Sequence, residues 1–117
     1  MHRLFLILTV LTTTAVAGEI NQLAAVAALQ QPNSILIDVR TASEFAEGAL
    51  PRATRIETQH LAQRIAGIAP DKDAPVIVYC RTGRRSSAAE DLLEEMGYSQ
   101  VINAGGYDDL KAALPAH

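Results

Sequence analysis

The sequence lacks the residues from which several common kinds of site are built. Among its 117 residues there is one cysteine, no tryptophan and only 4% aromatic side chains. A single cysteine excludes an intramolecular disulfide, a cysteine-rich zinc site and an iron–sulfur cluster held by the chain's own thiolates. The 10 basic residues are outnumbered by 13 acidic ones, giving a formal net charge of −3 at pH 7. We therefore expect no nucleic-acid partner, no metal and no cofactor.

The sequence does contain enough apolar residues for one folded unit. Hydrophobic residues make up 49% of the chain and charged residues 20%. This balance argues against a disordered chain, and the length suits one compact domain rather than two. No repeat, low-complexity segment or linker divides the sequence.

The first 17 residues have the three-part pattern of a secretory signal peptide. Met1-His2-Arg3 is a short basic region, residues 4–11 are apolar, and Ala15-Val16-Ala17 has the small-x-small pattern that signal peptidase reads. The alternatives are an uncleaved membrane anchor and a buried helix. An anchor needs about 20 apolar residues, and Thr12-Thr13-Thr14 interrupts this run early. We expect cleavage after Ala17, export of residues 18–117, and no stable membrane association after cleavage.

Strand and helix patterns alternate along the rest of the chain. Residues 34–39 and 75–79 are short apolar runs, typical of buried parallel strands, and residues 100–102 form a third short run. Periodicity and capping signals predict helices between and around them, over residues 21–30, 43–47, 58–69, 86–96 and 107–113. Strands that alternate with helices predict one α/β domain with a mainly parallel central sheet flanked by helices on both faces.

Local signals assign roles to individual side chains in these helices. Asn21 and Thr58 are predicted N-caps, and Ser87 and Glu90 have the spacing of a capping box. The buried stripe of the first helix is expected to contain Leu23, Val26, Ala27 and Leu29. A solvated acidic face is expected on the fourth helix, formed by Glu90, Asp91, Glu94 and Glu95.

The chemistry is concentrated where the second long strand gives way to a helix. The segment Cys80-Arg81-Thr82-Gly83-Arg84-Arg85-Ser86 lies there, and ligands of open α/β sheets bind beyond the carboxyl ends of strands. A tight loop entering a helix turns several backbone N–H groups toward one point, and Gly83 lets the chain curl around it. These amides and three arginines favour a Cys80 thiolate. The loop is predicted to be an anion pocket that holds a nucleophile.

A purely structural interpretation of these residues also exists. Cys80 could be a small buried residue, the arginines could face solvent and the serines could be simple caps. Asp38 and Arg40 are interpreted as an ion pair that braces a strand end, and His60 as a surface residue.

Three segments of the chain resemble the signatures of rhodanese domains. The amino-terminal signature is matched by Ile37-Asp38-Val39-Arg40 with Glu44-Phe45 and Gly48, and the active-site loop by residues 78–86. The carboxyl-terminal signature is matched by Gly97-Tyr98, Val101 and Ala104-Gly105-Gly106-Tyr107. With its leader and small size, the chain looks most similar to small periplasmic single-domain sulfurtransferases of the phage shock protein E type. Two departures concern packing: Arg52 stands at a usual glycine, and a common tryptophan is absent near Leu110.

The resemblance implies a thiosulfate sulfurtransferase. Cys80 would take the outer sulfur of thiosulfate, hold it as a persulfide and pass it to a thiophilic acceptor such as cyanide or a thiol. Arg81, Thr82, Gly83, Arg84, Arg85 and Ser86 would bind the substrate through backbone amides and positive charge. The implied partners are these small molecules only, the implied location is the periplasm, and nothing requires more than a monomer.

Two other functions fit parts of the pattern. Related cysteine phosphatases use a Cys-x5-Arg loop, but Ser86 stands where that arginine is required and Tyr79 stands where they have a histidine. A non-catalytic sulfur carrier or partner-binding module would keep the same loop, so the sequence leaves that alternative open.

Overall fold

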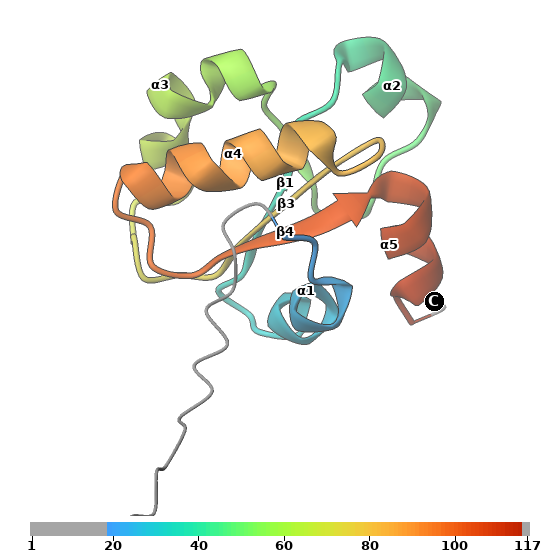
Figure 1. Ribbon diagram of the computed structural model, residues 1–117, viewed down its shortest axis with the longest axis horizontal. Coiled ribbons are helices and arrows are strands. Elements are labelled where there is room, and N and C mark those ends of the chain that lie inside the picture. The colour runs from blue at the N-terminus through green and yellow to red at the C-terminus, as the bar shows by residue number, and fades with distance from the viewer. Residues whose placement is uncertain (1–18, 116–117) are drawn as a thin grey trace, which may run out of the picture.

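The computed structural model describes residues 19–115, and it places four parallel strands in the order β2-β1-β3-β4 (Figure 1). The strands are β1 (Ile35–Asp38), β2 (Thr54–Arg55), β3 (Val76–Cys80) and β4 (Val101–Gly106). The helices are α1 (Gln22–Leu29), α2 (Ala42–Glu47), α3 (Thr58–Ile68), α4 (Arg84–Glu95) and α5 (Tyr107–Ala113). The predicted α/β class with a parallel sheet is confirmed. The short edge strand β2 was not predicted.

The helices cover both faces of the sheet, as expected. On one face, α3 and α4 pack Leu61, Ile65 and Leu93 against the strands. On the other face, α1 and α5 contribute Ala25, Ala28 and Leu110 to a second apolar cluster (Figure 1). Burial on both faces explains why β1 and β3 are apolar runs rather than alternating patterns.

Strand β3 lies between β1 and β4 and is buried along its whole length, Val76 to Cys80. Its register with β1 pairs Tyr79 with Asp38, so both strands end at the same edge of the sheet. Its register with β4 shifts between Val78 and Tyr79, which places Asn103 and Gly105 opposite those two residues. Strand β4 therefore extends beyond the predicted residues 100–102, and the two glycines after Ala104 belong to it.

Two of the predicted helix starts are wrong. Helix α3 is preceded by Glu57 rather than capped by Thr58, whose buried hydroxyl has no hydrogen-bond partner. Helix α4 begins at Arg84 after Gly83 and not at the serines, so Ser87 and Glu90 are past the capping positions. The physical reason is that Gly83 closes the preceding loop in a left-handed conformation, with φ of 99°, and starts the helix without a side-chain cap.

Two predicted faces also differ from the structure. The Asn21 cap of α1 is confirmed, because its side chain accepts a hydrogen bond from the amide of Ala24 at 3.0 Å. However, α1 is apolar almost all round, so periodicity does not identify its buried face: Ala25 is buried, whereas Leu23 is 88% exposed. On α4, Asp91, Glu94 and Glu95 are exposed as expected, but Glu90 is buried.

The structure does not test the predicted leader. The predicted signal peptide, residues 1–17, lies outside the described part of the chain. Between residues 19 and 115, no helix has both the length and the apolar character needed to cross a membrane. Within the same range, Arg52 is the one non-glycine residue with positive φ, at 70°.

Candidate active site

The turn between β3 and α4 wraps around the sulfur of Cys80. Cys80 is the last residue of β3 and is buried. The amide of Gly83 donates a hydrogen bond to its Sγ at 2.9 Å, and the hydroxyl of Ser86 lies 3.4 Å from the same sulfur. The strand therefore delivers the thiol to the point at which the loop and the first turn of α4 converge, as the sequence predicted.

This environment shifts the pKa of the thiol downward. Burial is the largest single influence and raises the pKa, because it disfavours the charged form. The Ser86 hydroxyl and the main-chain amides of Ser86, Thr82 and Gly83 act in the opposite direction and together outweigh burial. The net pKa of Cys80 is lower than its ordinary value, which is the condition for a reactive cysteine. Among residues 19–115, no group of three or more His, Cys, Asp or Glu side chains could hold a metal ion.

Two glycines of β4 allow close packing, Gly106 against the loop and Gly105 against Ile20. A Cβ added to Gly106 would lie 2.6 Å from the carbonyl oxygen of Arg81 and 3.3 Å from the Cα of Thr82. Gly105 has φ of 85°, and a Cβ there would lie 2.9 Å from the side chain of Ile20. These close approaches give the two glycines a physical reason to stand where they do.

A polar network behind the loop was not predicted. The Gly83 carbonyl accepts hydrogen bonds from the hydroxyls of Ser86 at 3.0 Å and Ser87 at 2.9 Å. Ser87 in turn accepts from the side chain of buried Asn103 at 2.9 Å, and Asn103 accepts from the amide of Gly105 at 3.0 Å. The network links α4, the loop and β4. A serine and an asparagine carry no local sequence signal for such a contact, because the partners are 16 residues apart in the chain.

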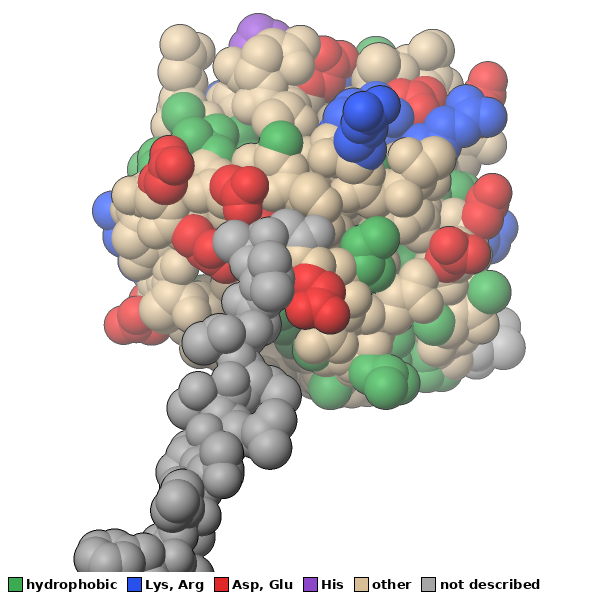
Figure 2. Space-filling view, in the orientation of Figure 1, with side chains coloured by type: hydrophobic (Ala, Val, Ile, Leu, Met, Phe, Trp, Pro, Cys, Tyr) green, Lys and Arg blue, Asp and Glu red, His purple; other side chains and the backbone are tan. Residues whose placement is uncertain are grey.

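The three arginines of the loop are in different situations. The Arg85 guanidinium forms two hydrogen bonds with the carboxylate of Glu44 on α2, at 2.7 and 2.9 Å. Arg81 has a side chain that is 71% exposed and lies 4.0 Å from the same carboxylate. Arg84 is exposed. Figure 2 shows basic side chains gathered over the amino-terminal end of α4. Positive charge therefore surrounds the loop as predicted, but one of its sources is already paired.

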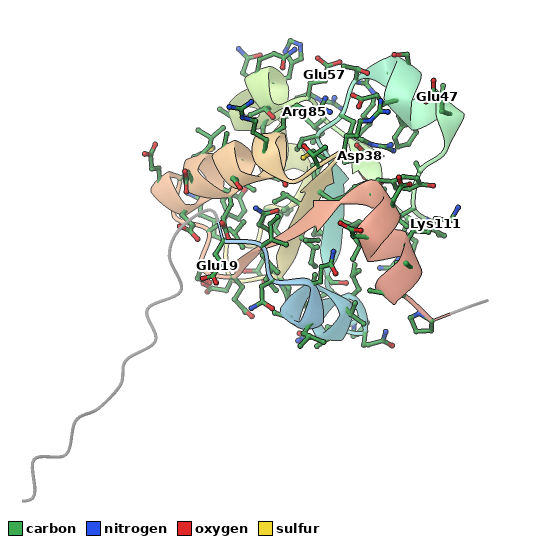
Figure 3. The ribbon with its side chains drawn as sticks, turned by 45° about the vertical axis from the view of Figure 1, so that its right-hand side comes forward. Glu19, Asp38, Glu47, Glu57, Arg85 and Lys111 are labelled. Carbon is green, nitrogen blue, oxygen red and sulfur yellow. The ribbon has the colours of Figure 1, made fainter. Side chains whose placement is uncertain are left out.

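The predicted ion pair of Asp38 and Arg40 is confirmed. Arg40 donates from Nε and Nη2 to the Asp38 carboxylate, with a shortest distance of 2.7 Å, and from Nη2 to the carbonyl oxygen of Gly48 at 2.7 Å. The guanidinium also lies 4.4 Å from the ring centroid of Tyr107. Both charged residues are buried, and they brace the end of β1 beside the loop. Asp38 is labelled in Figure 3.

A pocket of about 200 Å³ adjoins the loop on the side of α2 and α5. Its lining consists of Arg40, Glu44, Glu47, Gly48, Arg81, Tyr107 and Asp108. A second pocket of about 500 Å³ includes no loop residue and lies against α1 and the end of α5; Arg52 belongs to its lining and thus lies away from the thiol. His60 is exposed on α3 and takes no part in either pocket, as expected.

Comparison with known families decides the relationship. The model of the rhodanese-like domain matches residues 22–113, which include the whole sheet and the loop. The chain belongs to the rhodanese-like family. The three signatures recognised in the sequence lie within the matched range. The ends of β1 and β4, with Asp38 and Gly106, lie beside the loop, whereas Val101 lies at the opposite end of the sheet.

Several relatives of this rhodanese-like domain are named sulfurtransferases. Thiosulfate sulfurtransferase PspE of Escherichia coli is 42% identical over 79 residues, covering 68% of this chain and 74% of that protein. Thiosulfate sulfurtransferase GlpE of Pseudomonas fluorescens is 32% identical over 90 residues, covering 76% of this chain and 81% of that protein. Among solved structures, a rhodanese with anions from E. coli superposes with a TM-score of 0.66 at 40% identity, covering 70% of this chain and 94% of that chain.

Proposed function

We propose that this rhodanese-like domain is a thiosulfate sulfurtransferase whose catalytic residue is Cys80. The proposal depends on the buried sulfur of Cys80. This atom accepts a hydrogen bond from the Gly83 amide at 2.9 Å and lies 3.4 Å from the Ser86 hydroxyl. The Gly83 amide favours negative charge on sulfur, both as a thiolate and as a persulfide, and the Ser86 hydroxyl does the same when its hydrogen turns from the Gly83 carbonyl to the sulfur. The naming of relatives as thiosulfate sulfurtransferases supports the same donor.

In the first half-reaction, the Cys80 thiolate attacks the outer sulfur of thiosulfate. A bond forms between Sγ and that sulfur, the sulfur–sulfur bond of thiosulfate breaks, and sulfite leaves with the electron pair. The product is a cysteine persulfide whose terminal sulfur is anionic. Since the thiolate is already favoured, this step needs no general base, which agrees with the exposed position of His60 on α3.

In the second half-reaction, a thiophilic acceptor attacks the terminal sulfur of the persulfide. With cyanide, the new carbon–sulfur bond gives thiocyanate, and the electron pair of the broken sulfur–sulfur bond returns to the Cys80 thiolate. Residues 81–86 are the proposed substrate-binding loop, acting through main-chain amides. Arg81 and Arg84 are exposed and are placed to attract an anionic donor, whereas Arg85 is paired with Glu44.

The test is thiocyanate formation by residues 18–117 with thiosulfate and cyanide, comparing the native chain with Cys80→Ser. We expect turnover to fall at least about 1,000-fold in the variant, because no other residue supplies the nucleophile. Intact mass after thiosulfate should show one added sulfur that cyanide removes. Because Ser is nearly the size of Cys, we expect the variant to fold. Thermal unfolding checks this.

Two alternative functions predict different outcomes, one in the mass measurement and one in a separate hydrolysis assay. A sulfur carrier would gain the extra sulfur but would keep it in the presence of small acceptors. A cysteine phosphatase would hydrolyse an aryl phosphate in a Cys80-dependent way. Ser86, in place of the arginine on which such a phosphatase depends, stabilises sulfur rather than three phosphate oxygens, so we expect no hydrolysis.

We further propose that residues 1–17 are a cleaved leader and that residues 18–117 act as a periplasmic monomer. The three-part pattern of the leader supports export and cleavage; the monomer is proposed because nothing in the proposed mechanism requires a second chain. Expression of the full chain in a Gram-negative host should yield a periplasmic product whose intact mass starts at Gly18. A product that keeps Met1 and stays with the membrane would overturn this part of the proposal.

A further inference from the structure

Arg85 of the loop region forms a double hydrogen bond with Glu44 on α2. Glu44 lies on α2 and receives Arg85 through both oxygens, from Nη1 at 2.7 Å and from Nη2 at 2.9 Å. The carboxylate side chain is 15% exposed and the arginine side chain 39%. Figure 3 shows Arg85 at the start of α4, beside α2. The pair therefore joins two segments that are 41 residues apart in the chain.

Glu44 is itself held in place by its own helix. It closes a capping box with Thr41, accepting from the amide at 3.1 Å and from the hydroxyl at 3.0 Å. Its carboxylate is also the nearest anion to Arg81, at 4.0 Å. The carboxylate is thus fixed before it meets the loop, and its negative charge offsets the positive charge that the arginines bring to the thiol.

We propose that Glu44 attenuates the anion-binding loop: by holding Nη1 and Nη2 of Arg85, it draws that arginine away from the site and sets how strongly an anionic sulfur donor is bound. This inference rests on the proposed sulfur transfer. It assigns a positioning role to Glu44. Arg85 stays paired with Glu44 and does not bind the donor directly.

The physical argument is a competition for one guanidinium. An incoming dianion can take the two Arg85 hydrogen bonds from Nη1 and Nη2 only by displacing Glu44, and the carboxylate would then remain largely buried without its main partner. The donor therefore binds mainly to main-chain amides and to the exposed Arg81 and Arg84. The same attenuation acts on sulfite, the anionic product, so release of the product is favoured along with weaker donor binding.

The test compares Glu44→Gln, Arg85→Gln and the double variant by alkylation of the chain's one cysteine. The rate ratio of anionic iodoacetate to neutral iodoacetamide reports the local electrostatic potential without requiring sulfur transfer. Glu44→Gln frees a positive charge, so the ratio should rise about threefold; Arg85→Gln leaves a carboxylate unpaired, so it should fall about threefold. The double variant should return to the native ratio.

The steady-state prediction follows the same signs. With Glu44→Gln, KM for thiosulfate should fall and kcat should change less, whereas Arg85→Gln should raise KM. Glutamine keeps the oxygen that accepts from Thr41, and thermal unfolding checks that each variant is folded. The matched control is Glu47→Gln on the same helix, which removes an exposed carboxylate and should change the alkylation ratio less than half as much.

Three results would overturn the inference. The first is a change of the alkylation ratio in the same direction in both single variants, which a merely structural pair would give. The second is a change in Glu47→Gln as large as that in Glu44→Gln. The third is an unchanged ratio in Glu44→Gln. If the alkylation ratios shift as expected but no variant transfers sulfur, the attenuation stands and the proposed function fails.

Discussion

The carboxyl ends of β1 and β3 lie side by side in the sheet but present different groups. At the end of β1, Asp38 and Arg40 satisfy each other through several hydrogen bonds and are buried. At the end of β3, main-chain amides and a hydroxyl converge on one sulfur atom. Paired side-chain charges brace a structure and leave little for a ligand, whereas donors around a single ionisable atom create a reactive group. At this edge of the sheet, the end of β1 therefore stabilises the structure and the end of β3 holds the reactive group.

The largest stability effect is expected from breaking the supporting end. Asp38→Asn keeps the size of the side chain but removes the charge opposite a buried guanidinium. An uncompensated buried charge costs about 3–5 kcal/mol, so urea unfolding should show a loss of this order. Replacement of both partners, Asp38→Leu with Arg40→Met, should recover part of it. A loss below about 1 kcal/mol for Asp38→Asn would show that the pair is not a brace.

A similar but smaller effect is expected at the reactive end from Gly106→Ala. The new Cβ would lie 2.6 Å from the Arg81 carbonyl oxygen; that oxygen belongs to the main chain and the Cβ is fixed to it, so neither atom can turn away. We expect a loss of about 1–3 kcal/mol in urea unfolding, together with a raised pKa of Cys80 as the loop is displaced. Gly67→Ala is the control: no heavy atom lies within 4 Å of its Cβ, and helix propensity predicts a gain of up to about 1 kcal/mol. Equal behaviour of the two variants would contradict the close packing of loop and strand.

The sequence predicted the two strand ends because each has a local pattern. Asp38 and Arg40 are two residues apart at the end of an apolar run, and Cys80 to Ser86 occupy a strand–loop–helix junction. The sequence could not predict what joins the loop to distant segments. Glu44 with Arg85, and Asn103 with Ser87, are contacts between residues far apart in the chain, and no spacing rule relates them.

The wrong predictions have a related cause. Ser87 and Glu90 have capping-box spacing, but Gly83 starts α4 four residues earlier because the loop around the sulfur ends there. Leu23 fits a helical stripe, but α1 has apolar residues on every side and the sheet contacts its small alanines instead. In both cases tertiary packing decided between local patterns of similar strength.

The reactive end can also be altered at a single hydroxyl, by Ser86→Ala. The Ser86 hydroxyl is the strongest of the influences that lower the Cys80 pKa. Its removal should raise the pKa of the thiol, so less thiolate is present at neutral pH and alkylation by iodoacetamide slows. Ser87→Ala is the control: its hydroxyl donates to the Gly83 carbonyl, as that of Ser86 does, whereas the Ser86 hydroxyl also lies 3.4 Å from the sulfur. An unchanged pH profile in Ser86→Ala would mean that the main-chain amides alone set the thiol's charge.

The smallest effect is expected from the Glu44–Arg85 pair. Like Asp38 and Arg40 it is a pair of side-chain charges, and like the Cys80 site it involves the loop after β3. Hydrogen bonds from Arg85 are the main cause that lowers the Glu44 pKa from 4.5 to about 2. A lowered carboxyl pKa contributes stability that is complete above about pH 4.5 and is lost as the pH falls through about 2. The stability difference between the native chain and Glu44→Gln should therefore be constant from neutral pH to about pH 5 and then shrink toward pH 2, measured by urea unfolding at each pH. A difference that stays constant down to pH 2 would show that the carboxylate gains nothing from Arg85 and that the contact between α2 and the loop is held by the capping box and packing alone.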